Sequence, residues 1–160
     1  MKKFLHLVQK TAQIFNVLGG ISLTFLMLLT VLDVILRGFK HPIVGTYELV
    51  GFSGALAIGL ALPYTCWCRG HVFVDFLLAH LPETPARITN TLTRIVSLIL
   101  FLVFGWRLLS YGNDLKRIGE VSLTLQLPFY PVAWALAVAC WLVCLVLISD
   151  LVKIHLGEYE

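Results

Sequence analysis

The residues best suited to chemistry gather in one short segment, "YTCWCRGHVFVDFLL". It holds the cysteines Cys66 and Cys68, followed by Arg69, His71 and Asp75. Two nearby cysteines can form a redox-active pair, and a histidine beside a carboxylate can bind a metal ion or transfer a proton. One hypothesis is therefore a four-span membrane redox enzyme or anchor subunit that uses Cys66 and Cys68, or the histidines. Whether these residues can act together depends on the helices that position them.

The chain as a whole has the composition of a membrane protein. Hydrophobic residues make up 59% of its 160 residues, and charged residues only 13%. A helix needs about 20 mostly apolar residues to cross the hydrocarbon core, because its backbone N–H and C=O groups must be paired internally. Four stretches meet this requirement, at residues 14–36, 48–67, 88–111 and 127–149. The sequence therefore predicts an all-α membrane protein, a single domain over residues 1–160, with four transmembrane helices in a bundle joined by short loops.

The third and fourth spans have less regular boundaries. The uncharged run 95–106 is too short to cross the bilayer, so the third span must extend past Arg94 or Arg107. We expect these long arginine side chains to reach back to the membrane interface. The fourth span opens on Pro128 and Pro131, which a first helical turn tolerates because its N–H groups lack intrahelical partners.

Basic residues set the expected orientation in the membrane. Lys2, Lys3 and Lys10 precede the first span, and the apolar run after them is too long for a cleavable signal peptide. An even number of spans places both termini on one side, which we expect to be the cytoplasm. With this orientation, seven Lys and Arg residues lie on the cytoplasmic side and five lie outside. The five outside are Arg37, Lys40, Arg107, Lys116 and Arg117. The formal net charge of +3 is spread over loops and tails, so it does not indicate nucleic-acid binding.

Small residues recur at helical spacing along the second span. They form two neighbouring stripes, Gly51, Ala55, Gly59 and Ser53, Ala57, Ala61. In lipid, small residues allow two helix backbones to approach closely. The helix that approaches them belongs either to this bundle or to a partner protein, and the sequence leaves both possibilities open.

Charged residues stand at the ends of the first two spans. Asp33 and Arg37 are four residues apart, so on a helix they are predicted to pair or to share a partner. Glu48 follows Thr46, a candidate N-cap. The Glu48 carboxylate either interacts with the helix dipole alone or accepts a hydrogen bond or ion pair from a partner subunit.

The loop after the second span holds an apolar run, "HVFVDFLLAHL", that is too short to span the membrane. We expect it to lie at the interface. Arg69 can meet lipid phosphate, and Asp75 lies one helical turn after His71, close enough to pair. The alternative is that these three groups dock a larger subunit or fix the hairpin between the second and third spans.

The loop before the fourth span has a different pattern. Between Val121 and Leu127, apolar residues alternate with Ser122, Thr124 and Gln126, which predicts an extended strand. An isolated strand cannot pair its own backbone groups. We therefore expect this segment to lie against other protein.

The cysteines and histidines do not combine into a reactive site. Cys66 and Cys68 fall at the cytoplasmic end of the second span, and Cys140 and Cys144 in the middle of the fourth, where a thiol usually packs as a small hydrophobic group. All five histidines lie at span ends or in loops, so none is placed to ligate a haem in the bilayer. No Cys and His cluster completes a zinc site. We therefore expect no catalytic residue, no metal and no cofactor, and dispensable cysteines.

Several features recur in a fixed order along the chain. Arg37 closes the first span, Glu48 opens the second, "RGHVFVD" follows it, and "GEVSLTLQLP" leads into the fourth. With its four spans and short loops, the chain resembles, over nearly its whole length, the small DctQ-like membrane subunit of tripartite ATP-independent periplasmic (TRAP) transporters. The residues that match the family pattern after the second span are Arg69, His71, Val72, Val74 and Asp75. The pair Cys66 and Cys68 is not part of that pattern.

The resemblance implies a non-catalytic scaffold in the bacterial inner membrane. Its partners would be a large multi-span DctM-like permease subunit, a periplasmic substrate-binding protein and membrane lipids, and the complex would use an ion gradient to take up an organic acid. The residues expected at the partner interface are Arg37, Glu48, Gly51, Ala55 and Gly59. Those expected at the cytoplasmic hairpin or on lipid phosphate are Arg69, His71 and Asp75. Those through which the periplasmic loop is expected to dock are Ser122, Thr124 and Gln126.

Overall fold

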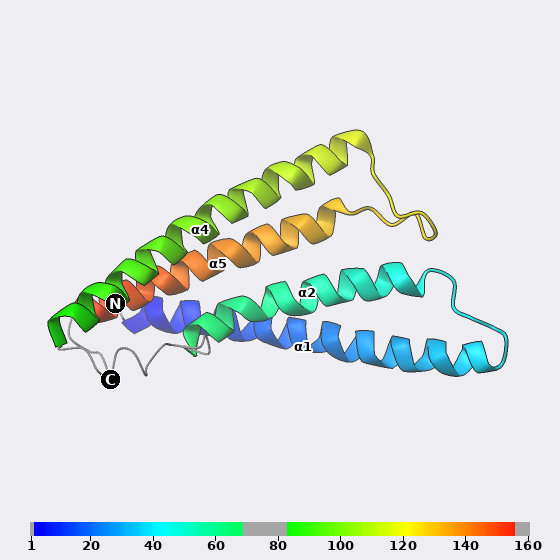
Figure 1. Cartoon of the computed structure of the whole chain (residues 1–160), viewed down its shortest axis with the longest axis horizontal. Coiled ribbons are helices and arrows are strands. Elements are labelled where there is room, and N and C mark those ends of the chain that lie inside the picture. Colours follow the sequence, from blue (N-terminus) through cyan, green and yellow to red (C-terminus); the bar gives the residue numbers. More distant parts are fainter. Residues whose placement is uncertain (1, 69–82, 156–160) are drawn as a thin grey trace.

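The computed structural model describes residues 2–68 and 83–155. Within these residues the chain forms four helices, α1 (Lys2–Gly38), α2 (Thr46–Trp67), α4 (Glu83–Ile118) and α5 (Tyr130–His155) (Figure 1). Each helix contains a stretch long and apolar enough to cross a membrane. The described residues form no strand beyond one isolated bridge, between Val121 and Pro128. The prediction of an all-α protein with four transmembrane helices is therefore confirmed.

The helices lie in a row. Figure 1 shows the order α4, α5, α2 and α1, with α2 packed against both α1 and α5, and α5 packed against both α2 and α4. In their most apolar windows, 50% of the residues of α5 and 28% of those of α2 are buried, against 11% in each of α1 and α4. The outer helices therefore present most of their apolar surface to lipid or to another protein.

The row is closed at one end and spread at the other (Figure 1). Near the N-terminus and the end of α5, a core forms from Val8 of α1, Cys66 of α2, and Val143, Val146 and Leu147 of α5. At the opposite end, which we call the loop end, lie the α1–α2 loop (residues 39–45) and the α4–α5 loop (residues 119–129). Here α4 and α1 are far apart (Figure 1), so contacts at the loop end must hold the spread helices in place.

The contact between α1 and α2 depends on a glycine. A Cβ atom at Gly19 would lie 3.0 Å from the backbone oxygen of Ala57 and 3.3 Å from the backbone nitrogen of Ala61. Beside it, the Ser22 hydroxyl donates a hydrogen bond to the Ser53 carbonyl at 2.9 Å. The stripe of Ser53, Ala57 and Ala61 therefore packs within this chain, against α1.

The contact between α4 and α5 repeats after seven residues. Trp141 of α5 lies over Gly105 of α4, where an added Cβ atom would be 2.8 Å from the indole ring. Trp134 lies in the same way over Gly112, where the nearest indole atom would be 2.5 Å away. Residues seven apart share one face of a helix. Two glycines on one face of α4 thus receive two tryptophans on the facing side of α5.

The helix boundaries differ from those of the predicted spans. Both α1 and α4 are longer than the spans 14–36 and 88–111. α5 begins at Tyr130 rather than at 127, because Pro128 forms the bridge with Val121 before the helix starts.

The Arg94 side chain packs inside the protein, and its expected reach to the membrane interface stays a prediction. Its side chain is only 6% exposed, and its Nε atom lies 3.6 Å from Oδ2 of Asp150, whose side chain is 7% exposed. The Asp150 carboxylate gives the guanidinium a partner inside the protein. The charge of Arg94 is therefore balanced by an opposite charge within the protein.

Polar clusters and an apolar groove at the loop end

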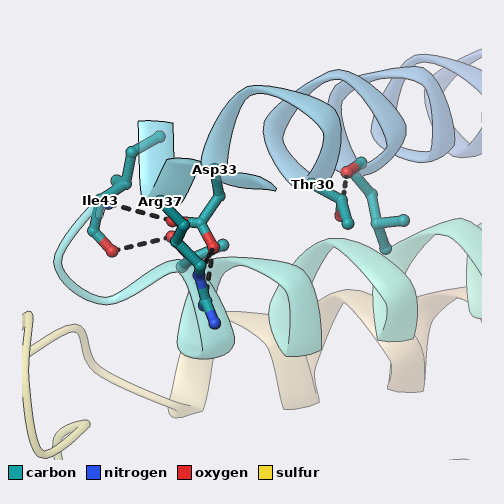
Figure 2. Close-up of polar contacts among 6 residues, drawn as sticks. Thr30, Asp33, Arg37 and Ile43 are labelled. Atoms are coloured by element: carbon teal, nitrogen blue, oxygen red, sulfur yellow. Dashed lines mark hydrogen bonds and ion pairs between the residues drawn. The ribbon is translucent and has the colours of Figure 1, made fainter. Parts of the chain in front are cut away.

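A buried carboxylate holds the α1–α2 loop. The Asp33 residue is only 3% exposed, and Oδ1 of its carboxylate accepts a hydrogen bond from the Ile43 N–H at 3.0 Å. Oδ2 accepts a hydrogen bond from Nε of Arg37 at 2.8 Å and lies 2.7 Å from Nη2. Figure 2 shows Asp33 between Arg37 and Ile43. The predicted pairing of Asp33 and Arg37 is confirmed, and the loop N–H is a further partner that the pattern did not indicate.

The start of α2 is organised differently from the expectation for Thr46. The N-cap position is Gly45, at φ 80°, and no side chain caps the helix there. The Thr46 hydroxyl instead donates a hydrogen bond to the Ile43 carbonyl at 2.9 Å. Glycine suits this position because its backbone is left-handed and because an added Cβ atom would overlap the side chain of Leu125. The two loops of the loop end therefore meet at Gly45.

The two members of the Asp33 and Arg37 pair should respond differently to mutation. Asp33→Leu removes the acceptor of the Ile43 N–H and should free the loop, whereas the Arg37 side chain is 60% exposed and Arg37→Leu should leave the loop in place. In detergent, hydrogen exchange at the Ile43 amide should accelerate about tenfold or more only in the first variant. Combining Asp33→Arg with Arg37→Asp restores the opposite charges but not the acceptor, so we expect no rescue. Equal exchange in both single variants would contradict this assignment.

A second carboxylate, that of Glu48, holds the α4–α5 loop. Its Oε2 atom accepts hydrogen bonds from the Ser122 hydroxyl at 2.7 Å and from the Leu125 N–H at 2.9 Å. Its Oε1 atom accepts one from the Thr124 N–H at 2.7 Å. Both oxygens are thus bonded to the loop of the same chain. Hydrogen bonds to an ionised acceptor are stronger than those between neutral groups, so Glu48 fastens this loop to the first turn of α2.

The α4–α5 loop turns back on itself, so the predicted extended strand is wrong. Ser122 closes the turn, because its N–H donates to the Leu127 carbonyl at 2.9 Å and its hydroxyl oxygen accepts from the Leu127 N–H at 3.0 Å. Gln126 takes a left-handed conformation, at φ 53°. The Glu48 carboxylate supplies acceptors for the N–H groups that the turn leaves without strand partners. The protein against which this segment lies is the chain's own α2.

An apolar groove of about 400 Å³ lies beside the Glu48 cluster, between α2, α4 and α5. Its lining is Tyr47, Glu48, Gly51, Phe52, Ala55, Leu108, Tyr111, Leu115, Phe129, Val132, Ala133 and Leu136. Gly51 is exposed, and an added Cβ atom there would meet nothing within 4 Å. Two turns further on, Gly59 is buried beneath Leu136 of α5. The stripe of Gly51, Ala55 and Gly59 is therefore open at the loop end and covered by this chain's own α5 at Gly59.

The structure brings only part of the predicted site together. Glu48 meets Ser122 and Thr124, and it lines the groove with Gly51 and Ala55. Arg69, His71 and Asp75 lie outside the described residues. Cys66, Cys140 and Cys144 are buried and Cys68 is exposed, all as free thiols. Among the described residues, no three His, Cys, Asp or Glu side chains are grouped to hold a metal ion.

Two features were missed by reasoning from the sequence. The Gly105 and Gly112 pair, and the Trp134 and Trp141 pair, share a seven-residue spacing that was visible in the sequence and predicts matching helix faces. The pairing of Arg94 with Asp150 has no comparable signal, because the two residues belong to different spans and are far apart in the sequence.

The four apolar helices define a multi-pass integral membrane protein, with polar groups that join its own helices and loops. The family described as "Tripartite ATP-independent periplasmic transporters, DctQ component" matches residues 26–156, which is most of the chain. No curated protein matches the sequence. The chain therefore belongs to the DctQ family and is a small permease component of a TRAP transporter.

Proposed function

We propose that this protein is a non-catalytic scaffold for a large DctM-like permease subunit in the bacterial inner membrane. The complex would use an ion gradient to take up an organic acid that a periplasmic binding protein delivers. Family membership supports the two partners, since TRAP systems combine these components. The scaffolding role, the class of substrate and the cellular membrane are part of the proposal.

The observation that carries the scaffolding role is the fastening of the helix row at both ends. The buried pair of Arg94 and Asp150 joins α4 to α5 near the closed end. At the loop end, Glu48 joins α2 to the α4–α5 loop, and Asp33 joins α1 to the α1–α2 loop. These charged groups make contacts that fix helices and loops relative to one another. Such a frame suits a subunit that stays stationary while its partner moves.

We place the large subunit on the apolar groove at the loop end. Gly51 leaves bare backbone open there, and small residues on a membrane helix allow another helix to approach closely. Ala55 also lines this groove. Glu48 lies at the edge of the groove and shapes that edge by holding the α4–α5 loop in place. Arg37 projects at the same end, where its exposed guanidinium is available to a partner. Gly59 is left out of this surface because Leu136 covers it.

The remaining contacts are assigned to the two faces of the membrane. We propose that the periplasmic binding protein approaches the loop end, where Ser122, Thr124 and Gln126 set the shape of the α4–α5 loop and Leu123 is fully exposed. On the cytoplasmic side, Arg69, His71 and Asp75 remain proposed contacts to lipid phosphate, to the hairpin or to the large subunit.

Filling the groove tests the proposed docking surface. Gly51→Trp adds a large side chain to the open lining and should weaken co-purification of the tagged large subunit about tenfold, with a matching fall in uptake. Gly20→Trp is the matched control, because Gly20 is exposed on α1 and also has nothing within 4 Å. The control should assemble normally. The opposite result, with Gly20→Trp disruptive and Gly51→Trp silent, would place the partner on α1 and overturn the assignment.

A further inference from the structure

The two loops of the loop end touch where Leu125 packs against Gly45. An added Cβ atom at Gly45 would lie 2.6 Å and 2.9 Å from the two methyl carbons of Leu125. The Leu125 side chain therefore occupies the space that a larger residue at position 45 would need. Because protein interiors are close-packed, a shift of either loop must compress this contact or give it up, and both are unfavourable.

A different carboxylate fixes each side of this contact. On the side of the α1–α2 loop, the Asp33 carboxylate accepts a hydrogen bond from the N–H of Ile43, just before Gly45. On the other side, the N–H of Leu125 itself donates to the Glu48 carboxylate at 2.9 Å. Asp33 thus holds the loop that carries Gly45, and Glu48 holds the residue that packs on it.

Each loop therefore has two states, one fastened and one released. In the fastened state the hydrogen bonds to its carboxylate are made, and in the released state these N–H groups are open to solvent. Native proteins undergo such local opening without unfolding as a whole. Two sites are coupled when both bias the same two-state element. A fastened α1–α2 loop keeps Gly45 beneath Leu125, which favours the fastened state of the α4–α5 loop, and the reverse also holds.

The state of the α4–α5 loop also affects the groove. Ser122 is bonded both to Glu48 and to Leu127, so a shift of the loop at Glu48 reaches its far end. There the ring of Phe129 packs edge-on against that of Phe52 of α2, with the ring centroids 5.1 Å apart. Both rings line the groove. Release of the loop would therefore move part of the groove wall.

We propose that the two loops fasten and release together, that the contact between Leu125 and Gly45 couples them, and that the α1–α2 loop thereby controls the shape of the groove. Phe39 and Val44 of the α1–α2 loop are 72% and 69% exposed. A partner that binds this loop can therefore stabilise the fastened state of both loops. The coupling is a property of this subunit alone and does not depend on the proposed function.

Hydrogen exchange in the isolated full-length subunit, in detergent, reports on both loops at once. Asp33→Leu releases the α1–α2 loop and should accelerate exchange at the Leu125 amide at least about fivefold, although it removes no hydrogen bond of that amide. Glu48→Ala releases the α4–α5 loop and should accelerate exchange at the Ile43 amide by the same factor, because coupling between two sites is reciprocal. We call these two accelerations the cross-effects.

Leu125→Ala tests the route of the coupling. It removes the side chain that packs on Gly45 but keeps the N–H that donates to Glu48. In this background both cross-effects should fall below about twofold, as expected for independent sites, while the direct effect of each carboxylate substitution on its own loop remains. Leu123→Ala is the matched control, because Leu123 lies in the same loop and is fully exposed. It should leave both cross-effects at full size.

Three results would overturn the proposal. A cross-effect smaller than about fivefold in either direction would mean that the loops open independently. Full cross-effects in the Leu125→Ala background would mean that the first turn of α2, which carries Glu48, transmits the shift instead of the packing contact. Equal acceleration at the amide of Leu147, in the core at the closed end, would mean that the variants unfold as a whole.

Discussion

Glu48→Ala is expected to release the α4–α5 loop from α2 while leaving the four helices folded. The substitution removes all three hydrogen bonds that the carboxylate accepts, from the Ser122 hydroxyl and from the Thr124 and Leu125 N–H groups. The two backbone groups then exchange with solvent. Hydrogen exchange at the Thr124 and Leu125 amides in detergent should accelerate at least about tenfold.

The same substitution should weaken assembly, because the loop and the groove share this edge of α2. We expect lower co-purification of the large subunit and lower uptake, with the helix content of the isolated subunit unchanged. Glu48→Gln should have an intermediate effect, since its amide retains one acceptor oxygen but turns an NH₂ donor toward a loop donor. Glu120→Ala, which removes an exposed acid in the same loop, is the matched control. If Glu48→Ala and Glu120→Ala behave alike, the Glu48 carboxylate acts only on the helix dipole.

The parts of this structure that could be predicted are those set by local sequence. Hydropathy located the four spans because each span needs about 20 mostly apolar residues, whose backbone hydrogen bonds are all paired within the helix. The Asp33 and Arg37 pair was predictable because residues four apart are neighbours on any helix. In both cases the interactions act within a few helical turns, so the residues that interact are also close together in the sequence.

The contacts that could not be predicted join distant parts of the chain. Glu48 and Ser122 are 74 residues apart, and nothing in the alternating pattern of the loop indicates that a carboxylate will replace a neighbouring strand as its acceptor. The burial of Arg94 likewise depends on Asp150 in another span. In the α4–α5 loop the local pattern predicted an extended strand and was wrong, because a tertiary contact offered the polar groups a better partner.

Adjacent glycines in α1 should give opposite results when enlarged. Gly19 is buried where α1 meets α2, and a Cβ atom there would lie 3.0 Å and 3.3 Å from backbone atoms of Ala57 and Ala61, which cannot rotate away. Gly20 is exposed, with nothing within 4 Å of an added Cβ atom. Both substitutions to leucine improve helix propensity by a similar amount, so they differ only in packing.

Gly19→Leu must therefore move α1 away from α2. The displacement would also break the hydrogen bond from the Ser22 hydroxyl to the Ser53 carbonyl, which depends on the same close approach. We expect a loss of about 3 kcal/mol or more in the free energy of unfolding, at the upper end of overpacking effects, seen as a lower midpoint of thermal unfolding in detergent. Gly20→Leu should leave that midpoint unchanged or slightly raised. A midpoint for Gly19→Leu within error of that for Gly20→Leu would mean that α1 does not pack on the stripe of Ser53, Ala57 and Ala61, and that this stripe is free to receive a partner helix.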